Sequence, residues 1–348
     1  MPNVTALQIC QTPNNCLFPV QFPLYHRYSS GALVPHYYPS VGLNISIPED
    51  WKRSSNIQSI NEIATYYAPI QGQSDKFNEN LVIIKGRYKN NLSSSVYSNA
   101  TLAGLEKLPD FQLQERDDNF ALGGSQANKF RYSYSSDRNQ YMSMQVGLIN
   151  SSTYLTFTYT AELGRYAEYI PTIEKILASV RINENILNEI PENKTITVVD
   201  KTHGISLTYP SNWMRTDGEY LGSNVTLLAP LESPSDSYYD NIRIYSRQIN
   251  QTNITSLENI VKEVEAKFNE TLKDFKVLST LNDTVSNNHA LNIIYTFTGN
   301  DGYPHKILRS TFLLKPNKLG YVIYDSTNNS FDKYMPSVKQ TLASLNIS

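Results

Sequence analysis

Apolar and polar residues alternate over two short stretches of the chain. One is GLNISIPEDW, at residues 42–51, and the other is GISLTYPSNW, at residues 204–213. Alternation with a period of two predicts a strand with one buried face, here over Leu43–Ile47 and Ile205–Tyr209. A proline, which cannot donate to a ladder, ends each strand, and a tryptophan follows. We assign four residues to two hydrophobic cores that the indole rings close: Pro48, Trp51, Pro210 and Trp213.

The similarity between the two halves of the chain extends further. Residues 63–90 and 224–251 share an Ala-Pro pair, then Ser-Asp, then a strand-like alternation. AEYIPTIEKILASVRI (167–182) and DKYMPSVKQTLASLNI (332–347) share Tyr, Pro, Leu-Ala-Ser and a final Ile without a gap. Three matching blocks in one order indicate a duplicated domain. The predicted organisation is an extended segment at 1–41, a first domain at 42–182, a linker at 183–201 and a second domain at 202–348.

Each copy predicts a strand, a second strand, a helix, three strands and a final helix. The middle helix is clearest in TSLENIVKEVEAKFNETLKDF, where apolar residues recur every three or four positions. Thr255 and Glu258 form a capping-box pattern there, and Asn99 is a candidate cap for the shorter NATLAGLEKL of the first copy. This order predicts an α+β fold, an antiparallel sheet covered by helices. The remaining predicted strands are 81–88, 126–134, 140–148 and 154–160, with 241–247, 289–297, 305–314 and 320–324 in the second copy.

These phrases resemble the PsbP-like family, above all GISLTYPSNW and YMPSVKQTLASLNI. The resemblance implies an α/β/α sandwich around an antiparallel sheet in each copy. The second copy matches well, whereas the first has Ile-Pro-Glu-Asp-Trp in place of Tyr-Pro-Ser-Asn-Trp and a shorter middle helix. The tandem, Asn-rich chain is similar to PsbP-like proteins exported by ammonia-oxidising archaea. Metal and partner binding are associated with the family, but no ligand motif carries over to residues of this chain.

Composition favours an exported protein. The chain has 348 residues, 25 Tyr, 35 Asn, a net charge of -2 and a pI near 6.2, which favours neither nucleic acid nor an anionic membrane as partner. No apolar run is long enough for a transmembrane helix. Thirteen Asn-X-Ser/Thr triplets are about twice the number that chance gives; they mark either N-linked glycans or an Asn-rich chain that forms triplets by accident. The candidates are Asn3, Asn44, Asn91, Asn99, Asn150, Asn193, Asn224, Asn250, Asn253, Asn269, Asn282, Asn328 and Asn346.

The chain start and the two cysteines bear on the same question. Residues 1–10 show no basic and apolar pattern of a signal peptide. Either a leader has been removed from this numbering, or the start is an artificial one, or the protein is cytosolic. Cys10 and Cys16 are the two cysteines. In an oxidising compartment they predict a local disulfide; the alternative is two unpaired thiols. No Cys and His cluster with zinc-site spacing accompanies them.

The search for chemistry gives no catalytic, cofactor-binding or metal-binding residue. The five histidines, at 26, 36, 203, 289 and 305, are scattered, although His289 and His305 begin neighbouring predicted strands. The acidic run at 115–119 lacks the glycine and spaced oxygens of a calcium loop and is interpreted as a solvated turn. No nucleophile elbow occurs. We therefore expect a protein that is not an enzyme and has no cofactor.

The segment at 1–41 is rich in Pro and Tyr and predicts an extended chain. It packs on its own domains, or on a neighbouring subunit where it adds a strand to an open edge, or it is a simple linker. The leading hypothesis is a non-catalytic exported glycoprotein that acts in binding or assembly, as an accessory subunit of a cell-surface complex or filament. Its partners are other protein subunits, including further copies of itself. The alternative is a small-ligand or metal-binding receptor that uses the cleft between the domains.

Overall fold

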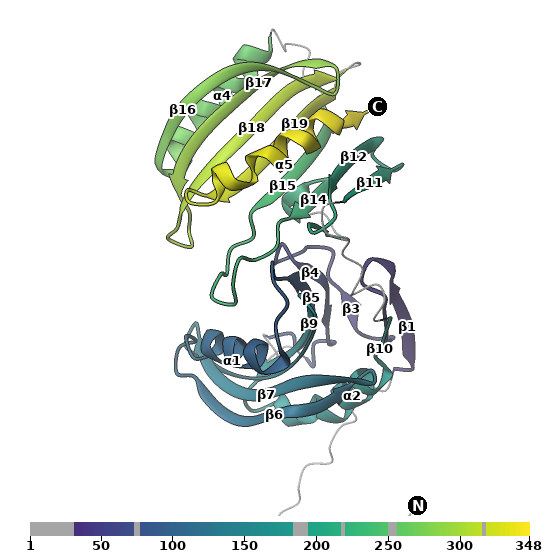
Figure 1. Ribbon diagram of the computed structural model, residues 1–348. Coiled ribbons are helices and arrows are strands. Elements are labelled where there is room, and N and C mark those ends of the chain that lie inside the picture. Colours follow the sequence, from purple (N-terminus) through teal and green to yellow (C-terminus); the bar gives the residue numbers. More distant parts are fainter. Residues whose placement is uncertain (1–30, 73–76, 184–193, 217–219, 250–255, 315–317) are drawn as a thin grey trace, which may run out of the picture.

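A computed structural model describes residues 31–72, 77–183, 194–216, 220–249, 256–314 and 318–348 (Figure 1). Within them the chain forms two domains, which we call domain 1 (residues 31–183) and domain 2 (residues 194–348). Both contain a seven-stranded antiparallel sheet, a three-stranded sheet and two α-helices. The fold class is therefore the α+β class predicted from the sequence.

The large sheet of domain 1 has the strand order β3-β4-β5-β9-β8-β7-β6, and the small sheet has the order β1-β2-β10. The helices are α1 (Ser94–Leu105) and α2 (Tyr166–Ser179). The strands are β1 (Leu33–Tyr38), β2 (Leu43–Pro48), β3 (Lys52–Arg53), β4 (Glu62–Tyr67), β5 (Asn80–Arg87), β6 (Gln112–Leu122), β7 (Ser125–Ser136), β8 (Asn139–Asn150), β9 (Thr153–Glu162) and β10 (Arg181–Ile182).

Domain 2 repeats this topology strand for strand. Its large sheet has the order β13-β14-β15-β19-β18-β17-β16, and its small sheet has the order β11-β12-β20. The helices are α4 (Leu257–Thr271) and α5 (Phe331–Ser344). The strands are β11 (Thr195–Asp200), β12 (Ile205–Pro210), β13 (Met214–Arg215), β14 (Val225–Leu228), β15 (Asn241–Gln248), β16 (Lys273–Val285), β17 (Asn288–Thr298), β18 (Pro304–Leu314), β19 (Lys318–Thr327) and β20 (Asn346–Ile347).

The helices of each domain lie on opposite faces of the large sheet. In domain 1, α2 packs on β2 and β9, while α1 packs on β6, β7 and β8. Neighbouring residues of β8 show the two faces: Val146 belongs to the core under α2, whereas Gly147 faces the ring of Tyr97 on α1. In domain 2, α4 and α5 bury separate apolar clusters in the same way. Each domain is thus an α/β/α sandwich.

Both tryptophans are buried in the core that contains the second helix. Trp51 is 5% exposed and its ring meets Tyr169 of α2 edge to face at 6.1 Å. Trp213 is 2% exposed and meets Tyr334 of α5 in the same way at 5.6 Å. Pro48 is buried and Pro210 is half-buried. Because the paired tyrosines are equivalent residues of the repeat, the two cores are closed by the same contact.

The serine of the shared Leu-Ala-Ser phrase joins each second helix to an opening strand. Ser179 Oγ accepts a hydrogen bond from the backbone N of Ser46 at 2.8 Å. In domain 2, Ser344 Oγ accepts one from the N of Thr208, also at 2.8 Å. The sequence repeat therefore encodes a repeated tertiary contact.

One strand of each domain lies before the repeat recognised in the sequence. β1 pairs with β2 in antiparallel register, so residues 33–38 of the Pro-rich segment add a strand to their own domain. β11 pairs with β12 in the same manner, although its residues were placed in the linker. Residues 1–30 lie outside the described part of the chain.

Three local predictions are wrong. Asn99 lies inside α1, and the cap is Ser93, whose hydroxyl accepts from the N of Val96. Ser256, not Thr255, caps α4 by accepting from the N of Asn259. The acidic run at 115–119 belongs to β6 and is no turn.

Replacing Trp213 by Ala should destabilise domain 2 by about 3–5 kcal/mol, because a large buried side chain is lost and a cavity remains. Trp51→Ala should do the same to domain 1. Urea unfolding followed by circular dichroism measures both losses. Tyr303→Ala, which removes a side chain that is 52% exposed, is the control and should change stability by less than about 0.5 kcal/mol. A loss below about 1 kcal/mol in either tryptophan variant would contradict the core assignment.

Candidate functional site

The two domains join through the end of β5 and the loop that follows β14. Tyr88 and Leu231 form a parallel bridge, in which the N of Leu231 donates to the O of Arg87 at 2.9 Å and the N of Lys89 donates to the O of Leu231 at 2.8 Å. A buried cluster surrounds this bridge and draws on both domains. Its members are Tyr88, Tyr97 and Tyr154 from domain 1, and Met214, Leu228, Leu231 and Tyr239 from domain 2.

Tyr154 of domain 1 contacts domain 2 directly in this junction. Its hydroxyl lies 2.7 Å from that of Tyr239, and both rings are buried. The ring crosses β5 at Gly86, where a Cβ atom would lie 2.0 Å from the ring. Only glycine leaves room for this crossing, so the β5 sequence positions Tyr154 against domain 2.

A cleft of about 710 Å³ lies beside the junction, between the domains. Domain 1 contributes the loop between β3 and β4 and two tyrosines; domain 2 contributes the remaining wall. The residues used below are Tyr88, Tyr154, Tyr220, Tyr238, Tyr239, Asn241, Arg243, Asp301, His305 and Asp325.

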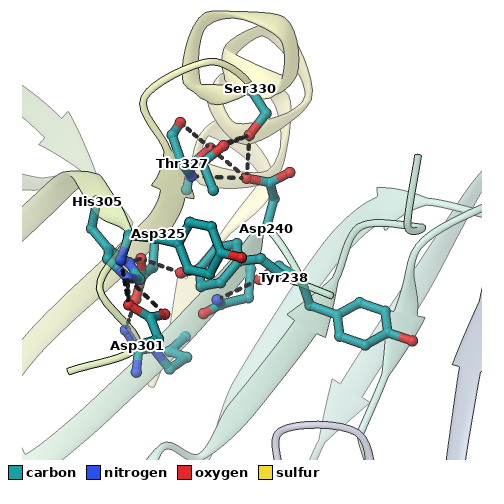
Figure 2. A network of polar contacts seen from close by, with 12 residues as sticks. Tyr238, Asp240, Asp301, His305, Asp325, Thr327 and Ser330 are labelled. Carbon is teal, nitrogen blue, oxygen red and sulfur yellow. Dashed lines mark hydrogen bonds and ion pairs between the residues drawn. The ribbon is translucent and has the colours of Figure 1, made fainter. Parts of the chain in front are cut away.

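The domain 2 wall carries a network of charged side chains centred on Asp325 (Figure 2). Asp325 Oδ1 accepts hydrogen bonds from the Tyr238 hydroxyl at 2.5 Å and from His305 Nδ1 at 3.0 Å. Its other oxygen, Oδ2, accepts from Arg243 Nη2 at 2.8 Å. These residues come from β15, β18, β19 and the loop before β15, so the large sheet fixes their spacing. Asp325, Arg243 and His305 are each less than 10% exposed.

The surroundings of His305 favour its cationic form. Its Nε2 lies 3.1 Å from Asp301 Oδ2, while Nδ1 faces Asp325. Ionised carboxylates only accept hydrogen bonds, so this arrangement favours a proton on each ring nitrogen. Burial lowers the pKa of His305, but the hydrogen bonds and charges of Asp325 and Asp301 outweigh it and raise the pKa above the ordinary 6.5. An imidazolium engaged at both nitrogens is a fixed positive group and no general base.

A second buried carboxylate lies next to this network. Asp240 Oδ1 accepts hydrogen bonds from Ser326 Oγ at 2.5 Å and Ser330 Oγ at 2.6 Å. Burial raises the pKa of Asp240 above its ordinary value despite these bonds. Domain 1 has Glu79 at the equivalent position, and Arg165 Nε lies 3.5 Å from its Oε1. A buried acid at this position is therefore a feature of the fold.

The network around Asp325, in contrast, belongs to domain 2 alone. Counting from the shared Ala-Pro pairs, Tyr238 corresponds to Phe77 and Arg243 to Val82. Strand register then makes Thr160 the counterpart of Asp325 and Tyr141 the counterpart of His305. The geometry agrees, since the Phe77 and Tyr141 rings lie 4.8 Å apart and the Tyr238 and His305 rings 4.9 Å apart. The fold is built in domain 1 without this cluster of charges.

Two polar atoms of the wall have no hydrogen-bond partner among the described residues. They are Asn241 Oδ1 and Arg243 Nε, and both residues line the cleft. Buried polar atoms are rarely left without a partner. Both atoms are themselves buried, so they lie behind the surface of the cleft wall.

The histidines that begin neighbouring strands do not meet. His289 pairs with Thr284 at one end of β17, whereas His305 pairs with Phe297 near the other end. Within the described residues, no group of three or more His, Cys, Asp or Glu side chains is arranged to hold a metal ion. In the same part of the chain, no helix is long and apolar enough to cross a membrane.

The candidate modification sites divide into two groups. Cys10, Cys16, Asn3, Asn193, Asn250 and Asn253 lie outside the described residues. Of the other nine glycan candidates, Asn150 and Asn224 are half-buried. The remaining seven are exposed: Asn44, Asn91, Asn99, Asn269, Asn282, Asn328 and Asn346.

Comparison with protein families finds a match in domain 1. Residues 43–179 match the model of the DcrB family. This match gives domain 1 a DcrB-type fold, and the α/β/α architecture of both domains is the one that the PsbP-like resemblance implied. The archaeal origin that the resemblance also implied stays a prediction. No curated protein matches the chain.

Several solved structures are similar at low identity. LpqN of Mycobacterium tuberculosis, described as involved in cell envelope biogenesis, is 17% identical over 44% of this chain and 91% of its own, with a TM-score of 0.34. Cyanobacterial PsbP from Synechocystis sp. PCC 6803 is 13% identical over 46% and 96%, with a TM-score of 0.35. The immunity protein TplEi of the Pseudomonas aeruginosa T6SS is 9% identical over 90% and 97%, with a TM-score of 0.26.

The raised pKa of His305 predicts a pH-dependent stability. In the unfolded chain the imidazole has its ordinary pKa, so the contribution of its charge is complete below that value. It should be lost as pH rises through the higher folded-state pKa. Urea unfolding of the protein and of His305→Gln between about pH 5 and about pH 9 measures this pH-dependent part of the free energy of unfolding. The variant should lack it.

His289→Gln is the control, since the Nε2 of His289 lies 3.1 Å from the amide oxygen of Asn282. It should keep the pH dependence of the unsubstituted protein. Equal pH profiles for His305→Gln and His289→Gln would contradict the cationic state of His305.

Proposed function

We propose that this protein is a non-catalytic binding protein that holds a small polar ligand in the cleft between its domains. One observation carries the proposal: the charged network of Tyr238, Arg243, His305 and Asp325 faces the cleft in domain 2, while equivalent residues of domain 1 are Phe, Val, Tyr and Thr. Buried charges are costly in free energy. A network that the fold does not require is therefore best explained by recognition.

The hydrogen bonds of His305 and Tyr238 favour ligand binding over catalysis. His305 has no free nitrogen, and the Tyr238 hydroxyl donates to Asp325. Burial and the charge of Asp325 raise the pKa of Tyr238 far above its ordinary value, so the phenol stays protonated. Neither group is poised to accept a proton. Rigid donors and acceptors of this kind orient a ligand.

The cleft suits a ligand with polar groups and an apolar face. Its lining includes polar side chains, among them Asn241, Asp301 and His305. Five tyrosines add aromatic surface and hydroxyl groups, as in many pockets for small molecules: Tyr88, Tyr154, Tyr220, Tyr238 and Tyr239.

Native mass spectrometry of protein purified from its source should show one extra small-molecule mass per chain, which denaturation releases. The variant that takes the domain 1 residues, Tyr238→Phe, Arg243→Val, His305→Tyr and Asp325→Thr, should fold but lose this mass. His289→Tyr, at the opposite end of β17, should keep it. Retention of the bound mass by the fourfold variant would contradict the cleft as the binding site.

We further propose that the protein works outside the cell as a glycosylated accessory subunit of a surface assembly. The exposure of seven described glycan candidates supports this, because a glycan needs an accessible Asn. The open edge of the domain 2 sheet supports contact with another subunit or a second copy. β16 forms that edge and exposes Leu278 (47%) and Leu281 (59%), and exposed apolar edge strands invite pairing.

Intact-mass analysis of the native protein tests the exported state. The mass should exceed the 39.5 kDa of the chain by glycan increments that an amidase removes. A thiol-alkylating reagent should label Cys10 and Cys16 only after reduction. An unmodified mass together with two thiols that react before reduction would contradict export.

A further inference from the structure

A second cavity lies on the domain boundary and differs in chemistry from the cleft. Its volume is also about 710 Å³. It is lined by the end of β5, the start of β11 and the outer turns of α5, and Tyr88 borders both cavities. We call it the basic groove.

The lining of the basic groove contains cations and no acidic residue. Its charged residues are Arg87, Lys89 and Lys194, in a chain whose net charge is -2. The rest of the lining is rich in groups that donate hydrogen bonds, among them Asn90, Ser151, Ser152, Asn212 and Gln340. Positive charge and neutral donors without a competing carboxylate are what an oxyanion requires.

Arg87 is the buried member of the set, with 6% of its surface exposed. Its Nε donates to Thr153 Oγ1 and its Nη1 donates to the backbone O of Ser211, both at 3.2 Å. No carboxylate partners it within the part of the chain that the structure describes. Burial lowers the pKa of Arg87 to about 10, which leaves it charged at neutral pH. A buried cation without a counter-charge is costly.

The internal repeat shows that the fold does not require this arginine. The residue equivalent to Arg87 at the end of β15 is Gln248, which is exposed. Lys89 has a carboxylate within reach, since its Nζ lies 3.4 Å from Glu232 Oε2. Glu232 also contacts Lys333 and the hydroxyl of Tyr334, so it neutralises the groove only in part.

We propose that the basic groove binds an oxyanion, the phosphate or sulfate group of a polar ligand. The Arg87 guanidinium supplies the buried charge, because its planar fork matches tetrahedral oxyanions. Lys194 and Lys89 approach from the rim, and the neutral amides and hydroxyls bind the oxygens or hydroxyl groups of the ligand. This site is separate from the proposed ligand cleft and does not depend on it.

Isothermal titration calorimetry at constant ionic strength tests the proposal, with unglycosylated full-length protein because Asn91 lines the groove. Inorganic phosphate and sulfate are the probes. Glucose 6-phosphate against glucose shows whether the anion or the sugar is recognised. We expect saturable binding of the three anions, and none of glucose or chloride.

Lys194→Gln should weaken phosphate binding about tenfold or more, because it removes one charge-assisted hydrogen bond. Lys194 is exposed, so this variant folds even if Arg87→Gln disturbs the junction. Lys276→Gln removes a charge that is also exposed, on β16, and should leave binding unchanged.

The fourfold cleft variant should also bind phosphate normally, which separates failure of this site from failure of the cleft. Absence of saturable anion binding would overturn the proposal. Equal affinities for Lys194→Gln and Lys276→Gln would overturn it too.

Discussion

The arrangement of this molecule depends on the contact between Tyr154 and Tyr239. Tyr154 lies on the face of the domain 1 sheet that carries the short helix α1, and domain 2 completes the cover of that face with Leu231 and Tyr239. In domain 2 the longer α4 buries the corresponding face from within its own domain. The domains are therefore joined by an apolar surface that domain 1 cannot cover alone. Both interdomain cavities lie beside this joined surface.

Comparison of the two domains distinguishes residues that the fold requires from residues that occur in one domain only. The tryptophan and tyrosine pairs, the helix serines and a buried acid occur in both domains, so they serve the fold. The charged wall of the cleft and the buried Arg87 occur once, and their counterparts are neutral. Such single occurrences are the stronger guide to function in a repeated structure, because an identical fold forms without them.

The sequence predicted the parts of the fold that leave a periodic or repeated signal. Strands buried on one face, such as β2 and β12, alternate apolar and polar residues. The amphipathic helix α4 has an apolar residue at every third or fourth position. β6 and β16 were missed because edge strands are exposed on both faces and carry little hydrophobic pattern. The start of β16 was also assigned to the helix, because Leu272 and Phe275 continue the helical spacing past the end of α4. The cleft network was missed because Tyr238, His305 and Asp325 are distant in sequence and form no motif; strand-by-strand alignment of the copies was the signal that could have found them.

Tyr88 and Leu231 form the bridge between the domains, and Tyr88 lines both interdomain cavities. A rotation of one domain about this bridge therefore alters the shape of both cavities at once. Two buried contacts beside the bridge oppose such a rotation: the Tyr154 and Tyr239 hydroxyls meet, and Arg87 donates to the backbone O of Ser211.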